Sequence, residues 1–310
     1  MPLFKTIQED QNQKTMQLNL YAKSYSFTLN KNFCVSCQIC VLACPKEAIK
    51  LEKQPKISGE KAKKAKVEVD IAKCNFCGIC DVLCPYGAIR VTVNGENILS
   101  VVEKESFPRL IRNISVDSSK CPKDCIECEE ACPLDLIQVT KLTGEGKAVE
   151  CPQSLSEEDR KRLKVKIDIE KERCPCCRIC EFKCPEGVLF VRKFFHGTID
   201  INLEKCPDGC RDCLDVCPIT GALYFSDEDK KIHVNETFCT YCGACKVVCP
   251  VEEALDIERT MISHTPVRSG AWNKACERLT SPIGITKELK TIGSMKARES
   301  LKKRFILKEE

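Results

Sequence analysis

The sequence predicts an α+β protein of three tandem units, in which short strands and short helices surround cysteine-rich loops, followed by a C-terminal extension. Cysteine supplies 27 of the 310 residues, and most cysteines stand in six segments of similar spacing. Stretches that alternate apolar and polar side chains flank these segments, as half-buried strands do. Aromatic residues make up only 6% of the chain, which favours several small modules over one large core.

The six cysteine segments form an internal repeat. Four have the spacing C-x2-C-x2-C-x3-C-P, and the third and fifth have one more residue in the first gap. The proline after each fourth cysteine fixes φ and removes a backbone N–H, which suits a chain that leaves a short helix. These prolines are Pro45, Pro85, Pro133, Pro185, Pro218 and Pro250.

This spacing is typical of [4Fe–4S] clusters bound in pairs, in which three cysteines of one segment and the fourth of its mate bind the same cluster. We pair neighbouring segments because the longer first gap occurs in the third and the fifth, each followed by a shorter one. Six clusters are therefore expected. Their predicted ligand sets are Cys34, Cys37, Cys40 and Cys84; Cys74, Cys77, Cys80 and Cys44; Cys121, Cys125, Cys128 and Cys184; Cys174, Cys177, Cys180 and Cys132; Cys206, Cys210, Cys213 and Cys249; and Cys239, Cys242, Cys245 and Cys217.

A nested pairing stays open beside this sequential one. Cys184 and Cys206 are 22 residues apart, as are Cys217 and Cys239. The fourth and fifth segments could therefore pair with each other, inside a pair formed by the third and sixth.

Strands are predicted on both sides of the segments from their period-two alternation. Side chains inside the loops are expected to exclude water from the clusters: Ile39, Ile79, Ile126, Ile179 and Ala244. An acidic stretch at 227–229 predicts a hairpin turn. The predicted strands cover 26–29, 67–71, 164–169, 198–203 and 231–234 before segments, and 88–91, 136–139 and 222–225 after them.

Three cysteines lie outside the repeat. Cys151 and Cys276 are expected to be buried small residues without a ligand role. Cys176 is interpreted as a bystander beside Cys174, although it could replace Cys174 as a ligand. The C-x3-C-x2-C portions also match radical-SAM spacing, but a fourth cysteine follows each, whereas that chemistry needs one iron left open.

Composition and motifs exclude several other classes of protein. Residues 1–23 are polar, unlike a secretory signal, and no run of eighteen apolar residues occurs, so we expect no membrane span and a cytoplasmic location. The formal charge of +4 does not indicate nucleic acid binding, because each cluster with its four thiolates contributes roughly −2. The chain has no P-loop and no dinucleotide-binding glycine motif.

Domain boundaries follow from the segments. We expect an N-terminal arm at 1–23, units at 24–100, 101–195 and 196–260, and an extension at 261–310. The lysine-rich stretch 53–66 is interpreted as a solvated hairpin tip. The extension is basic and helix-like over 287–308 and holds the only tryptophan. It could be a strap across the units or a docking element for a partner subunit.

Strand, cluster loop, short helix and strand, repeated twice in each unit, resembles the bacterial two-cluster ferredoxin fold. The run of six segments resembles archaeal polyferredoxins. The Cys-Pro variants at 121–133 and 206–218, and the stretch 264–279 with its Arg-Ser-Gly-Ala-Trp-Asn, are similar to the polyferredoxin-type iron–sulfur subunit of formylmethanofuran dehydrogenase. That family commonly carries eight segments, and this chain has six.

The resemblance implies an electron-transfer subunit of methanogenesis without catalytic residues of its own. It would relay low-potential electrons to a molybdenum or tungsten pterin subunit, similar to formate dehydrogenase, that reduces CO2. An amidohydrolase-like subunit would be a further partner, and other polyferredoxin copies could join them. The alternatives are a hydrogenase or heterodisulfide reductase assembly, a free electron carrier, and a colourless zinc-binding scaffold.

Overall fold

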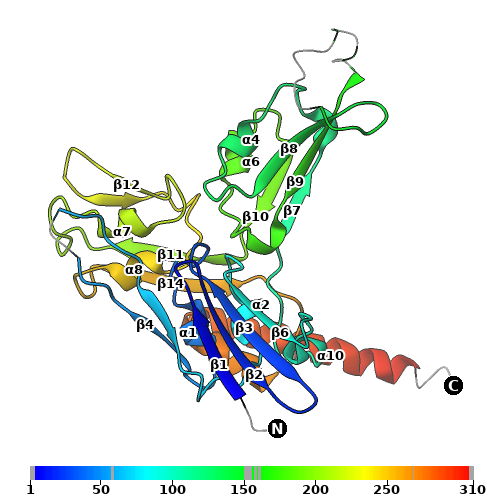
Figure 1. Cartoon of the computed structure of the whole chain (residues 1–310), viewed down its shortest axis with the longest axis vertical. Helices are drawn as coiled ribbons and strands as arrows, with labels where there is room; N and C mark the ends of the chain where they lie inside the picture. Colours follow the sequence, from blue (N-terminus) through cyan, green and yellow to red (C-terminus); the bar gives the residue numbers. More distant parts are fainter. Residues whose placement is uncertain are drawn as a thin grey trace.

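The computed structural model describes residues 4–56, 59–149, 156, 159, 162–267 and 269–306. Three stretches share one strand pattern, and each holds two of the cysteine segments (Figure 1). We name them the first repeat (residues 24–93), the second repeat (113–192) and the third repeat (195–262). In each, an outer antiparallel strand pair encloses an inner antiparallel hairpin.

In the first repeat β3 pairs with β6 outside and β4 with β5 inside. Each short helix follows the second cysteine of its segment and ends just before the fourth. The elements are β3 (Ser24–Asn30), α1 (Ile39–Ala43), β4 (Ile49–Glu52), β5 (Lys66–Val69), α2 (Ile79–Val82) and β6 (Ile89–Val93). A short helix, α3 (Ser100–Glu103), follows the repeat.

The second and third repeats have the same order. In the second, β7 pairs with β10 and β8 with β9; in the third, β11 pairs with β14 and β12 with β13. The second repeat comprises β7 (Asn113–Val116), η1 (Ser118–Lys120), α4 (Glu127–Glu130), β8 (Ile137–Leu142), β9 (Lys164–Ile169), η3 (Lys171–Arg173), α6 (Ile179–Lys183) and β10 (Leu189–Arg192). The third comprises β11 (Phe195–Ile201), α7 (Asp212–Val216), β12 (Leu223–Phe225), β13 (Ile232–Val234), α8 (Ala244–Val248) and β14 (Leu255–Ile262).

The predicted mixture of strands and short helices is confirmed. The strand expected at 164–169 coincides with β9, the other expected strands overlap observed ones, and the turn at 227–229 joins β12 to β13. The strand pairing is between neighbouring segments and not nested, since β8 pairs with β9 and β12 with β13.

The expected N-terminal arm contains a hairpin that extends the first repeat. β1 (Phe4–Glu9) pairs with β2 (Gln13–Asn19), and β2 pairs with β3, which gives a four-stranded sheet in the order β1-β2-β3-β6. Asp10 forms the turn, because its Oδ1 accepts the backbone N–H groups of Asn12 and Gln13 at 2.7 Å each. Met16 of β2 is fully buried.

The first and third repeats share one apolar core, whereas the second projects from them (Figure 1). The second repeat has small cores of its own, around Val165 and Val188 and around Ile137 and Leu189. Its attachment to the rest runs through Ile114 and neighbouring residues of the shared core.

The loop between β4 and β5 does not stay in solvent as expected, and that interpretation of 53–66 is wrong. Lys56 forms an ion pair with Asp212 of α7, and the backbone N–H of Ala62 donates to Asp215 Oδ2 at 2.9 Å. Lys53 Nζ donates to the carbonyl oxygen of Cys249 at 3.1 Å. The loop therefore clasps the third repeat, where acidic side chains meet its lysines.

The C-terminal extension folds as two helices, α9 (Gly270–Leu279) and α10 (Pro282–Ile306). α9 lies against α1 and buries Trp272, while the first half of α10 lies against β14 and α9. The far end of α10 leads away from the body of the molecule (Figure 1). No helix in the described part of the chain is long and apolar enough to cross a bilayer.

Candidate metal centres

Left-handed backbone at two fixed positions shapes the four loops that have the shorter spacing. In the first segment these positions are Ser36 (φ 59°) and Gln38 (φ 69°), one before and one after the second cysteine. Each reverses the chain locally, so three successive cysteines can face one point. The equivalent residues are Phe76 and Gly78, Cys176 and Arg178, and Tyr241 and Gly243, all with positive φ.

The two loops with the longer first gap follow a different path. Ile126 and Arg211, the residues after the second cysteine, have φ of −133° and −128°. Ile126 thus occupies the position of Gln38 and not that of Ile39, and it is 38% exposed. The expectation that Ile126 excludes water is wrong, whereas Ile39, Ile79, Ile179 and Ala244 are all buried.

The structure brings the thiols of the first repeat together in two sets. Cys34, Cys37, Cys40 and Cys84 line one pocket. Burial raises the pKa of Cys80 well above its usual value, and the thiols of Cys77, Cys74 and Cys44 raise it further because they lie close by. Each set combines three cysteines of one segment with the fourth of the other.

The second and third repeats show the same crossed grouping. Burial raises the pKa of Cys128 to about 11, followed by the nearby thiols of Cys121, Cys125 and Cys184. One pocket is lined by Cys132, Cys174, Cys177 and Cys180, and another by Cys206, Cys210, Cys213 and Cys249. The last group is Cys245 with Cys242, Cys239 and Cys217.

The donor set of each group fits an iron–sulfur cluster. Four thiols surround each space, and backbone N–H groups already point at sulfur, as hydrogen bonds to cluster ligands do. A residue with positive φ three positions after the fourth cysteine turns the next N–H toward Sγ. These bonds run from Ala48 to Cys44 (3.4 Å), Ala88 to Cys84 (3.3 Å), Leu136 to Cys132 (3.3 Å) and Val188 to Cys184 (3.3 Å).

The same thiols do not suit a single ion. In the described part of the chain, no three His, Cys, Asp or Glu side chains converge closely enough to bind one metal ion. Zinc would need four such ligands at bonding distance from one point. The wider spacing favours a larger inorganic group over a zinc scaffold.

One cysteine set of each repeat contacts another repeat, and we call these three the inner sets. Cys37 lies close enough to Cys242 for that thiol to raise its pKa, after the larger effect of burial. Cys177 and Cys217 pack around the same apolar residues, Ile219 and Ala222. The inner sets contain Cys37, Cys177 and Cys242, and the outer sets contain Cys74, Cys121 and Cys206.

Two arginines that the sequence interpretation missed lie between the inner sets. Arg259 donates to the carbonyl oxygens of Tyr241 and Cys242, and Arg112 donates to those of Cys84 and Cys174. A sequence signal existed for Arg259, because a charged residue stands there at a buried position of a strand.

The cysteines outside the repeat differ in their surroundings. Cys176 is fully buried and does not line the pocket that Cys174 lines. A hydrogen bond from the Cys176 thiol lowers the pKa of Cys174 to about 7. Cys276 is buried on α9, with its Sγ 3.5 Å from Thr280 Oγ1. Cys151 lies outside the described residues.

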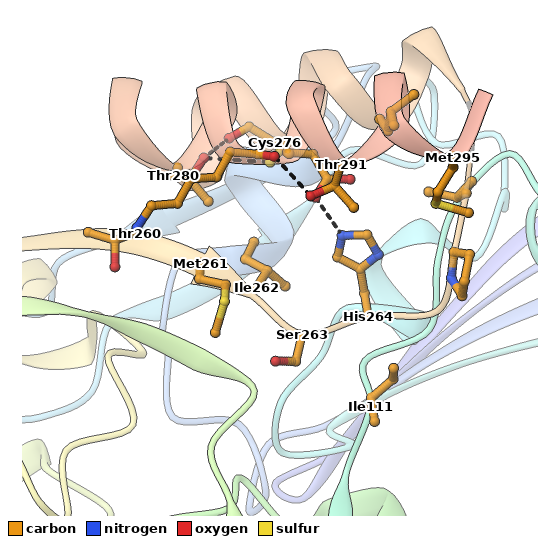
Figure 2. Close-up of a pocket in the computed structure, with 16 residues that line it drawn as sticks. Ile111, Thr260, Met261, Ile262, Ser263, His264, Cys276, Thr280, Thr291 and Met295 are labelled. Atoms are coloured by element: carbon orange, nitrogen blue, oxygen red, sulfur yellow. Dashed lines mark hydrogen bonds and ion pairs between the residues drawn. The ribbon is translucent and has the colours of Figure 1, made fainter. Parts of the chain in front are cut away.

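A further pocket, of about 340 Å³, lies between the end of β14 and α10 (Figure 2). His264 points from the strand end toward α10, and its Nε2 lies 3.2 Å from Glu288 Oε2. The indole N–H of Trp272 donates to Glu288 Oε1 at 3.0 Å. These contacts anchor α10 to the third repeat.

Comparison with known proteins agrees with the thiol groups. Residues 33–88 and 198–250 each match the 4Fe-4S dicluster domain. These ranges fall within the first and third repeats. Both therefore belong to the class of domain that binds two [4Fe–4S] clusters.

Relatives extend the likeness to most of the chain. The polyferredoxin-like subunit of aliphatic sulfonate oxidoreductase from Pyrococcus furiosus is 34% identical over 107 residues, which cover 31% of this chain and 59% of that protein. A chain of the formate dehydrogenase–heterodisulfide reductase–formylmethanofuran dehydrogenase complex from Methanospirillum hungatei is 30% identical, with a TM-score of 0.74 over 89% of this chain and 91% of that chain. The chain belongs to the polyferredoxin-like electron-transfer proteins.

This polyferredoxin is shorter in its match to curated relatives than to the solved structure. It spans 59% of the Pyrococcus protein and 57% of an NADH-quinone oxidoreductase subunit I of Geobacter metallireducens, to which it is 34% identical over 82 residues. The polyferredoxin therefore shares an iron–sulfur part with these proteins.

Proposed function

We propose that this polyferredoxin holds six [4Fe–4S] clusters and relays low-potential electrons to a molybdenum or tungsten pterin subunit of a formylmethanofuran dehydrogenase complex that reduces CO2. The observation that supports this most strongly is the likeness over 91% of a chain from a complex that includes formylmethanofuran dehydrogenase. An amidohydrolase-like subunit would be a further partner. The polyferredoxin itself would contribute no catalytic residue.

The proposed ligands are the six thiol groups described above, including the two of the second repeat, which we propose as a third ferredoxin unit. Its strand order and crossed thiols equal those of the other repeats. When bound, each cluster exchanges one electron at a low potential, since all its ligands are cysteines. The chain places the sets, buries the thiols and directs backbone N–H groups at sulfur.

The layout of the sets supports a relay with three ends. Cys37 neighbours Cys242, and Cys177 neighbours Cys217, so the inner sets of all three repeats meet. Each inner set also adjoins the outer set of its own repeat, as Cys40 does with Cys80 and Cys217 does with Cys213. A protein that served a single donor and a single acceptor would not need a third end.

A second candidate target is a heterodisulfide reductase, because the complex that contains the similar chain also includes one. In either case we propose a cytoplasmic location. No disulfide joins any described cysteine, which suits a reducing compartment.

The test is anaerobic purification of the tagged chain from its native cells, with its partners identified by mass spectrometry. We expect a pterin subunit and an amidohydrolase-like subunit to co-purify, and about 24 iron atoms per chain. A colourless chain without iron and sulfide would refute the relay. A brown chain that brings down only hydrogenase subunits would refute the proposed target.

A further inference from the structure

Arg259 is a buried charged residue at the contact between the first and third repeats. It is only 7% exposed. Its guanidinium donates to the carbonyl oxygens of Tyr241 at 2.8 Å, Cys242 at 2.7 Å and Leu279 at 3.3 Å. Two of these acceptors belong to the loop that carries the inner set of the third repeat.

This guanidinium has no carboxylate partner among the residues that the structure describes. The charged groups that act on it are thiols, first Cys37 of the first repeat and then Cys242, Cys239 and Cys245 of the third. An arginine stays protonated in proteins, and a buried charge needs a counter-charge. Two loaded cysteine sets would provide it, with roughly −2 from each.

A glycine brings these groups together. Gly243 follows the ligand Cys242 and has φ +97°. A Cβ at this position would lie 3.2 Å from Arg259 Nη2 and 3.3 Å from the carbonyl oxygen of Cys37. The loop of the third repeat, the guanidinium and the first repeat therefore meet at one point.

Arg112 occupies the corresponding place between the first and second repeats. Its Nε donates to the carbonyl oxygen of Cys174 at 3.0 Å, and its Nη2 to that of Cys84 at 3.1 Å. Cys84 belongs to the inner set of the first repeat and Cys174 to that of the second. The inner set of the first repeat thus has an arginine on each of two sides.

We propose that Arg259 and Arg112 are positioning residues that raise the reduction potentials of the inner clusters, most of all the cluster of Cys34, Cys37, Cys40 and Cys84, so that electrons collect where the repeats meet. The proposal rests on the ligand sets proposed above. Reduction makes a cluster one unit more negative, so a fixed positive charge beside it stabilises the reduced form more than the oxidised form. In the dry interior this effect is larger than at the surface.

The test is a redox titration of the full-length, iron-loaded chain, followed by electron paramagnetic resonance. In the variant Arg259→Gln, we expect two of the six reduction steps to shift to lower potential by at least tenfold in their equilibrium constants, about 59 mV for a one-electron step. Arg259→Lys keeps the charge and should shift them by less than threefold. The control Arg90→Gln, whose side chain is 52% exposed on β6 of the first repeat, should leave all six unchanged.

Three results would overturn the inference. One is an Arg259→Gln protein with its full iron content and an unshifted titration. Another is an equal shift in Arg259→Lys, because the hydrogen bonds and not the charge would then be responsible. If Arg259→Gln binds less iron, Arg112→Gln provides the test, and an unshifted titration there is the third.

The iron content of the unaltered chain separates this inference from the proposed function. A chain without iron would refute the ligand sets and the relay. A fully loaded chain whose titration ignores both arginines would refute only the role of the arginines.

Discussion

Cys176 and Cys177 are neighbours in the sequence but face different surroundings. Cys177 lines the pocket with Cys132, Cys174 and Cys180, whereas Cys176 occupies the left-handed position that Ser36 holds in the first repeat. A side chain at that position turns away from the three ligands of its loop. The alternative in which Cys176 replaces Cys174 is therefore disfavoured by the backbone.

We expect Cys176→Ser to keep all its iron. Serine stands at the same position in the first repeat, so the backbone accepts it. Iron analysis of the anaerobic protein should still give about 24 atoms per chain, while Cys177→Ser, the matched control, should lose up to about four. Equal losses in both variants would make Cys176 a ligand.

Gly243 offers a second test at the residue scale. We expect Gly243→Ala to destabilise the protein by more than the roughly 1–2 kcal/mol that left-handed backbone costs an alanine, because its Cβ would also press on Arg259 and Cys37. Thermal unfolding of the loaded protein measures this. Gly95→Ala is the control, since Gly95 has φ +85° but nothing within 4 Å of an added Cβ; equal effects would rule out the contact.

At the scale of elements, α10 is held by one carboxylate. Glu288 accepts from Trp272 of α9 and pairs with His264 at the end of β14. We expect Glu288→Ala to leave both donors without this partner, at a cost of about 1–3 kcal/mol. Amide hydrogen exchange in the first half of α10 should then accelerate. Glu277→Ala, an exposed change on α9, should not accelerate it.

The pH dependence of this anchor follows from the ionisation of Glu288. Burial raises its pKa, but the hydrogen bond from His264, its charge and the bond from Trp272 outweigh burial and bring the pKa below the usual 4.5. The contribution is therefore present above pH 4.5 and disappears as the pH falls through the lowered pKa. Exchange in α10, corrected for intrinsic rates, should rise over that range in the natural chain and stay flat in Glu288→Gln.

Most elements could be predicted because their signals are local. Alternation located the strands around the segments, and cysteine spacing located the short helices. The hairpin of β1 and β2 was missed because polar side chains such as Lys14 break the pattern. Lys14 is buried, but an ion pair with Glu68 at 2.7 Å compensates its charge, and the pair joins residues 54 positions apart.

Ile126 shows how a local signal can mislead. The extra residue in the first gap of its segment moves it to the position before the buried one, where the buried apolar side chain of other loops is replaced by Glu127. Aligning the loops on the third cysteine instead of the first would have shown this. The clasp formed by 53–65 could not be predicted, because its acceptors Asp212 and Asp215 lie more than 150 positions away.

At the scale of the whole molecule, the shared core of the first and third repeats consists largely of cysteine-bearing loops. Buried Cys37, Cys239, Cys242 and Cys245 are members of it. Thiols that surround a cluster-sized space cannot pack against each other. The clusters would therefore complete this core, and folding should depend on them.

We expect iron removal under anaerobic conditions to abolish cooperative unfolding. Circular dichroism should show loss of strand signal and of a thermal transition, and iron with sulfide should restore both. The iron-loaded chain treated with the same chelator too briefly to lose metal is the control. A metal-free chain that still unfolds cooperatively would show that the apolar residues suffice.

The pairing of segments within repeats could be predicted from their spacing, but the meeting of the inner sets could not. It depends on contacts such as Tyr86 Oη with Thr240 Oγ1 at 3.1 Å, which join different repeats. Nothing in local spacing encodes such contacts. The same holds for the roles of Arg112 and Arg259, whose acceptors are backbone carbonyl groups that any sequence possesses.

The partnership of the first and third repeats has a consequence for how the protein is made. The ribosome releases the first repeat long before Asp212, Cys242 or Arg259 exists, so its inner loops and the lysine clasp lack their neighbours during much of synthesis. The second repeat, with cores of its own, has less to wait for. Nascent chains stalled after residue 192 should therefore shield the middle repeat from protease earlier than the one synthesised before it.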